Sequence, residues 1–228
     1  MTQDPDAHAA LLCDWCIGVR ENDQVLVGMT LQSVALVRAI HSALLERGAW
    51  PLIRLAPGEL APDFFRHARD SQLDGFAPIE LAEAQAADGV ISITAPANTR
   101  ALQSVDPGLI ARAGKGRVPV QEARLEKRWC STVWPTPALA QQASMGDDEY
   151  AGFVARALFL DRPDPVAAWR SLSERQGRLI ERLARARQIR IEAEGTDLSV
   201  GVEGRTWVNS DGKRNMPSGE VFTGPIED

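Results

Sequence analysis

The sequence of 228 residues contains little cysteine and little histidine, three residues of each. Three cysteines leave one thiol unpaired in any disulfide scheme, and this composition excludes the small disulfide-rich scaffolds. No apolar run approaches the roughly 18 residues of a membrane span. Residues 1–8 are acidic and polar, where a signal peptide would be basic and then apolar. We therefore expect a cytoplasmic protein with no membrane partner.

Cationic residues are in the minority, with 25 Lys and Arg against 31 Asp and Glu, so the net charge is -6. Phosphate binding requires a concentrated basic surface, and we therefore expect no nucleic-acid partner. The apolar fraction of 44% is ordinary for a globular protein and excludes disorder. At roughly 150 residues per domain, the length corresponds to about one and a half domains. Either one large domain fills the chain or a second domain is incomplete.

Two of the cysteines, Cys13 and Cys16, form a CxxC motif inside an apparent first helix. Such a motif can be a redox pair or half of a zinc site. The other half of a zinc site is missing, because Cys130 stands alone and the histidines show no ligand spacing. A redox pair is expected at the start of a helix that follows a strand. We interpret these residues as reduced structural thiols, as in a reducing compartment.

The first half of the chain alternates short apolar runs with helical patterns. The predicted strands are 24–30, 50–55 and 89–94. The predicted helices between them are 33–47, which ends at Gly48, and 62–71. This alternation is typical of βαβ units and predicts an α/β domain with a parallel sheet and helices on both of its faces.

The pattern of the second half changes near residue 188. A further strand is predicted at 130–134, followed by helices 144–160, with Ser144 and Asp147 at capping spacing, and 165–188, with Asp164 as N-cap. Beyond them, apolar and polar residues alternate strictly, which predicts short antiparallel strands. We therefore predict an N-terminal α/β domain over 1–188, and over 189–228 the first strands of a second, incomplete domain.

The common catalytic signatures are absent, among them GxGxxG, GxxxxGK[ST], GxSxG and HExxH. The missing phosphate loop disfavours a nucleotide-binding flavodoxin-like domain. The informative segment is 204–228, which carries four glycines and two prolines among polar residues. Within it, Glu220 follows a Pro-Ser-Gly turn at the start of a short apolar run. A carboxylate placed in this way can project its oxygens into a cleft.

The run NMPSGEVFTGPIED (215–228) resembles the signature NMPxGEVFTxPxED of the M29 family of metallo-aminopeptidases, the group of aminopeptidases T and S. The segments WPTPALAQQASMGDDEY, FVARALFLDRPDPVAAW and TDLSVGVEGRTWVNSDG are similar to the same family. The resemblance covers most of residues 128–228 and continues more weakly back to the first predicted strand.

The resemblance implies that Glu220 is a ligand of two divalent metal ions, which would be zinc, cobalt, manganese or magnesium. In such centres the ions activate a bridging water that attacks the scissile carbonyl. It also implies peptide substrates with a free N-terminus and a homodimer. The family's other ligands come from beyond position 228, so we expect this chain alone to be an inactive N-terminal part followed by the start of an α+β catalytic domain. Glu227 and Asp228 complete the signature and are not expected to be ligands.

An alternative from a different class stays open. If the protein ends at Asp228, it is a non-catalytic α/β module for dimerisation or ligand binding. An in-frame continuation of the gene, rich in His, Glu and Asp, would favour the enzyme over this module.

Overall fold

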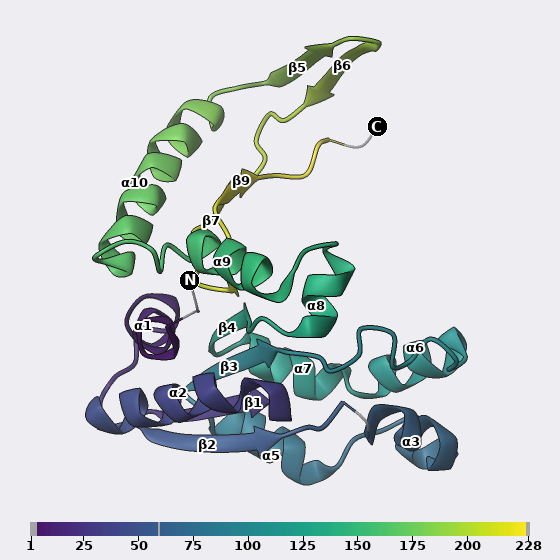
Figure 1. Ribbon diagram of the computed structural model, residues 1–228. Coiled ribbons are helices and arrows are strands. Elements are labelled where there is room, and N and C mark those ends of the chain that lie inside the picture. The colour runs from purple at the N-terminus through teal and green to yellow at the C-terminus, as the bar shows by residue number, and fades with distance from the viewer. Residues whose placement is uncertain (1–3, 59, 227–228) are drawn as a thin grey trace.

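The computed structural model describes residues 4–58 and 60–226. At its centre is a five-stranded sheet in which every pair of neighbours is parallel, with the order β2-β1-β3-β4-β8 (Figure 1). The strands are β1 (Gln24–Met29), β2 (Trp50–Leu55), β3 (Gly89–Thr94), β4 (Arg128–Val133) and β8 (Asn215–Met216). The predicted α/β class with a parallel sheet is confirmed.

Helices flank this sheet on both faces (Figure 1). The α-helices are α1 (Pro5–Leu11), α2 (Val34–Glu46), α3 (Leu60–His67), α4 (Asp70–Leu73), α5 (Pro78–Ala86), α6 (Pro107–Gly116), α7 (Val118–Leu125), α8 (Pro137–Gln142), α9 (Asp147–Ala157) and α10 (Pro165–Leu183). A π-helical turn, η1 (Leu12–Cys16), continues α1, and a 3-10 turn, η2 (Leu31–Ser33), precedes α2. No described helix combines the length and the apolarity that a membrane span requires.

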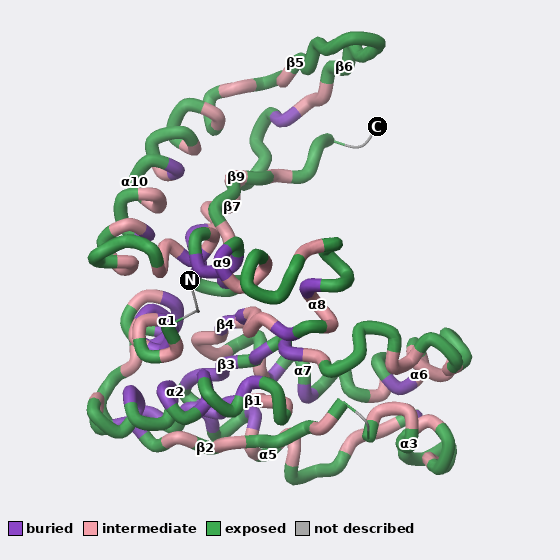
Figure 2. Tube along the Cα trace, viewed as in Figure 1, coloured by how far each residue is buried: buried purple, intermediate pink, exposed green. Residues whose placement is uncertain are grey.

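The larger core lies between the sheet and helices α1, α2 and α10. Val25 and Val27 of β1 are fully buried there, whereas Leu26 between them belongs to a separate cluster, because successive side chains of a strand point to opposite faces. Trp169 of α10 is also fully buried, and its Nε1 donates a hydrogen bond to the carbonyl of Leu158 at 3.0 Å. Buried residues concentrate in this region, while the end of the chain that follows α10 is mostly exposed (Figure 2).

The predicted strands and the first predicted helix agree with the structure to within a few residues. The helix predicted at 33–47 is α2, and Gly48 after it has a φ of 71°. The helix predicted at 62–71 is wrong as a single element, because it is divided into α3 and α4. Arg69 between them is extended, with a ψ of 165°, and its N–H donates to Oε1 of Gln72 at 3.0 Å, which starts a new helix.

Two further helices were predicted with imperfect boundaries. Ser144 does not cap α9, because Ser144 has a φ of 56° and Gly146 is the N-cap residue. The predicted cap of α10 is confirmed, since the Asp164 carboxylate accepts from the N–H of Ala167 at 2.9 Å. This helix ends at Leu183, before the position predicted.

After α10 the chain forms two antiparallel pairs. β5 (Gln188–Ala193) and β6 (Thr196–Gly201) make a hairpin, and β7 (Val208–Ser210) pairs with β9 (Glu220–Phe222). Between β7 and β9 the chain returns to the parallel sheet as β8. The domain boundary near residue 188 stays a prediction, and the chain beyond it contributes the fifth strand of the α/β sheet.

Two glycines of α6 provide a matched test of packing. A Cβ at Gly116 would lie 2.7 Å from the carbonyl carbon of Asp74 and 2.8 Å from the nitrogen of Gly75, whereas a Cβ at Gly114 would meet nothing within 4 Å. We expect Gly116→Ala to lower the free energy of unfolding by about 1–3 kcal/mol, because the backbone of residues 74–75 must move. Gly114→Ala should raise it by about 0.5–1 kcal/mol through helix propensity. Urea denaturation measures both, and changes of the same sign would contradict this packing.

Candidate functional site

Glu220 is the first residue of β9 and lies opposite Ser210, the last residue of β7. The turn before it is fixed by hydrogen bonds: the N–H of Gly219 donates to the Ser210 carbonyl at 2.9 Å, and the Ser218 hydroxyl donates to the same carbonyl at 3.0 Å. Gly219 has a φ of 116°, which a residue with a side chain rarely adopts. The sequence thus folds locally so that an exposed carboxylate begins the strand.

The Glu220 side chain lines a cavity of about 660 Å³, which we call the Glu220 cavity. Its wall combines two tryptophans, polar residues of β7 and two cations. Its lining includes Trp129, Trp207, Asn209, Asp211, Lys213 and Arg214. Trp207 Nε1 and Asn209 Oδ1 are buried and have no hydrogen-bond partner among residues 4–58 and 60–226. The cavity therefore combines the Glu220 carboxylate with two tryptophan rings and two cations.

Asp211, the other acidic residue of this wall, is buried and makes hydrogen bonds that hold neighbouring elements together. One carboxylate oxygen, Oδ2, accepts from the Ser173 hydroxyl at 2.7 Å and from Lys213 Nζ at 3.0 Å. The Asp211 carbonyl accepts from Trp15 Nε1 at 2.7 Å. This residue therefore ties the loop after β7 to α10 and η1. No sequence motif marks this residue, because Ser210-Asp211-Gly212 is a triplet typical of any turn.

Two buried hydrogen bonds in series connect β8 to β4 and α1. The Thr132 hydroxyl donates to the carbonyl of Met216 at 2.9 Å, so its oxygen is left to accept from His8 Nε2, also at 2.9 Å. Nε2 of His8 therefore carries a proton and is the donor to Thr132. Burial lowers the pKa of His8 from 6.5 to about 3, in agreement with a neutral ring.

The three cysteines are free and buried. Burial raises the pKa of Cys13 to about 12 and also raises the pKa of Cys16. A protonated thiol is a poor nucleophile and a poor metal ligand, since both roles require the thiolate. The interpretation of these residues as structural thiols fits this environment.

The described part of the chain does not form a metal centre by itself. Within residues 4–58 and 60–226, no group of three or more His, Cys, Asp and Glu is arranged to hold a metal ion. Of the acidic residues in the Glu220 cavity, Asp211 is already bound to Ser173 and Lys213, which leaves Glu220. Glu227 and Asp228 lie outside the described residues. One carboxylate by itself is too few ligands for a two-metal centre.

Comparison with known proteins assigns this chain to a family. The family of thermophilic metalloproteases designated M29 matches residues 2–228. The class is therefore that of the metalloproteases, and the chain belongs to the M29 family.

Two relatives extend this assignment. Aminopeptidase 2 of Geobacillus stearothermophilus is 30% identical over an alignment of 253 positions. The alignment covers 98% of this chain and 60% of the relative. The structure of wild-type AmpT from Thermus thermophilus matches with a TM-score of 0.76 and 21% identity, over 97% of this chain and 61% of the other. The second match concerns the fold alone. The chain thus spans about three fifths of the length of both proteins.

Proposed function

We propose that this chain is part of a metallo-aminopeptidase that releases N-terminal residues from peptides, and that Glu220 is one ligand of its two divalent metal ions. The observation that carries the proposal is the placement of Glu220 at the start of β9, in the wall of a cavity of about 660 Å³. Membership of the M29 family and similarity to a protein named aminopeptidase 2 support it.

The other ligands are proposed to come from residues outside 1–228. The described residues supply no second set of ligands. Zinc, cobalt and manganese suit a mixture of carboxylate and imidazole ligands, and magnesium is a further candidate.

The test compares this chain with the product of the gene read beyond codon 228. We expect the 228-residue chain to hydrolyse no aminoacyl anilide in the presence of cobalt or zinc, because it lacks the remaining ligands. The longer product should hydrolyse them and should lose this activity on treatment with a chelator. A stop codon directly after codon 228 would contradict the proposal, as would turnover by the short chain that Glu220→Ala removes.

A further inference from the structure

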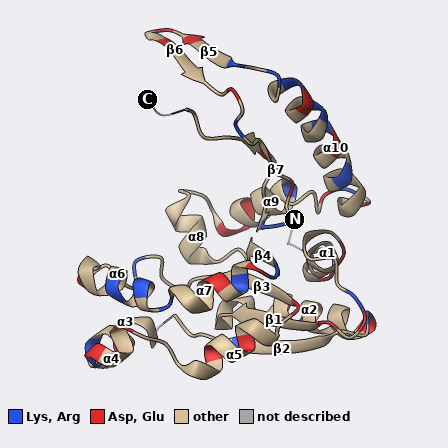
Figure 3. Ribbon diagram, turned by 180° about the vertical axis from the view of Figure 1, so that it is seen from behind, with Lys and Arg blue, Asp and Glu red and all other residues tan. Residues whose placement is uncertain are grey.

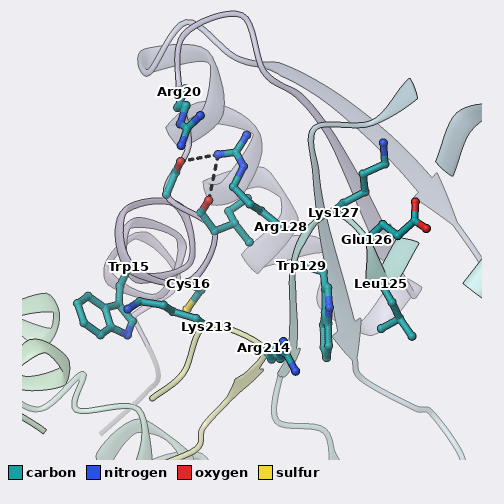
Figure 4. A pocket seen from close by; sticks show the side chains of 12 residues that line it. Trp15, Cys16, Arg20, Leu125, Glu126, Lys127, Arg128, Trp129, Lys213 and Arg214 are labelled. Carbon is teal, nitrogen blue, oxygen red and sulfur yellow. Dashed lines mark hydrogen bonds between the residues drawn. The ribbon is translucent and has the colours of Figure 1, made fainter. Parts of the chain in front are cut away.

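A second cavity, of about 480 Å³, lies beside β4 where this strand begins, between η1, the end of α7 and the loop after β7 (Figure 4). We call it the basic cavity, because five of its lining residues are cationic and one is acidic. The cationic residues are Arg20, Lys127, Arg128, Lys213 and Arg214, and the acidic residue is Glu126. Trp129, Lys213 and Arg214 line both this cavity and the Glu220 cavity, so the two adjoin each other.

Two of the cations hold the walls of the basic cavity in place. Arg128 donates to the carbonyls of Ile17 and Gly18 at 3.1 and 2.6 Å and pairs with Asp23 at 2.7 Å. Lys213 pairs with Asp211 and lies 4.5 Å from the centre of the Trp15 ring. Each of these two positive charges is neutralised by a carboxylate.

The part of the chain that the structure describes contains twelve ion pairs, and neither Arg20 nor Arg214 takes part in any of them. Arg214 lies beside Trp129, and Arg20 lies at the other end near Arg128 (Figure 4). Basic and acidic residues are interspersed over much of the rest of this acidic chain, and α10 is a second region rich in arginine (Figure 3). The basic cavity therefore retains an excess of positive charge next to the carboxylate of Glu220.

We propose that the basic cavity binds the terminal carboxylate of a short peptide whose amino end lies in the Glu220 cavity. This inference rests on the proposed function and names its substrate class, peptides short enough to occupy both cavities. Arg214 lies where the cavities meet and supplies donors for the carboxylate, because its guanidinium can bind both carboxylate oxygens. Trp15, Leu125 and Trp129 provide apolar surface for the last side chain.

Binding of blocked peptides to the 228-residue chain tests the inference without requiring catalysis. The probe is an N-acetylated tripeptide, which has no free amine, in its acid form and in its C-terminal amide form. Isothermal titration calorimetry should give an affinity about 10-fold higher for the acid, since the amide lacks the charge that a guanidinium recognises. Arg214→Gln should remove most of this difference, and Arg214→Lys should retain part of it. Lys115→Gln, an exposed cation of α6, is the matched control and should change nothing.

Several outcomes would overturn the inference. One is equal binding of the acid and the amide, and another is an unchanged preference in Arg214→Gln when its melting temperature matches the parent. Inorganic phosphate that binds as tightly as the acid peptide would indicate a site for small anions instead. The blocked peptides cannot be aminopeptidase substrates, so these results stay separate from the turnover assay that tests the proposed function. Glu220→Gln should bind the acid peptide within about 2-fold of the parent, while it lowers kcat/KM of the longer gene product by about 1000-fold.

Discussion

Glu220→Gln in the longer gene product is expected to lower kcat/KM for aminoacyl anilides by about 1000-fold, which corresponds to about 4 kcal/mol of transition-state stabilisation. Glutamine keeps the size of the side chain but removes the negative charge that a divalent ion requires of a carboxylate ligand. Because Glu220 is exposed at the start of β9, the substitution should leave the fold intact. Steady-state kinetics and metal content measured by mass spectrometry report the two consequences separately.

The control for this substitution is Glu203→Gln. Glu203 lies in the same part of the chain, after α10, in the loop between β6 and β7. Its exposed carboxylate pairs with Arg187 at 3.1 Å. We expect wild-type kcat/KM and metal content from this variant. Full activity and full metal content in Glu220→Gln would exclude Glu220 as a ligand.

Acidification is expected to destabilise the protein through His8. The pKa of this residue is lowered to about 3 in the folded state, against 6.5 for an ordinary histidine. Between these values the unfolded chain binds one more proton than the folded chain. The contribution of neutral, buried His8 to the free energy of unfolding is therefore complete above about pH 6.5. It is lost progressively as the pH falls toward 3. The slope approaches about 1.4 kcal/mol per pH unit in that window.

His8→Gln isolates this contribution. The glutamine amide can still donate to the Thr132 hydroxyl, but it has no proton to gain in this range. Denaturant unfolding from pH 7 to pH 4 should give a shallower loss of stability for His8→Gln than for the parent. The control is His41→Gln, an exposed residue of α2, which should follow the parent curve. Identical curves for the parent and His8→Gln would show that burial of His8 does not control acid stability.

The strands of the parallel sheet were predictable because their signal is local. β1, β2 and β3 are short apolar runs bounded by turn residues, and each lies within a residue of its predicted range. Helices α5, α6 and α7 were not predicted. Their buried residues are few and mostly small, such as Ala84 of α5 and Ala113 of α6, so they produce little apolar periodicity. The glycine packed at the end of α6 is a feature of the fold that no propensity scale contains.

The candidate site was predictable only in part. Glu220 stood out because a contiguous motif surrounds it, and such a motif is visible without coordinates. The structural role of Asp211 was not visible, since its partners Ser173 and Trp15 are 38 and 196 positions away. The basic cavity was equally hidden, because it joins η1, the start of β4 and the loop after β7, three separate parts of the chain. A negative net charge of the whole chain does not indicate where its cationic residues cluster in the fold.

The sequence alone determined the first four strands of the parallel sheet, helix α2 and the family, because periodicity, turn residues and a contiguous motif act over a few residues. The tertiary structure decided that a stretch of only two residues, Asn215–Met216, becomes the fifth strand of the sheet. Its pairing with β4 and its hydrogen bond from Thr132, 84 positions away, have no local signal. The same return of the chain sets Lys213 and Arg214 beside the Glu220 cavity. Such placements depend on long-range packing, which brings residues together that no local pattern connects.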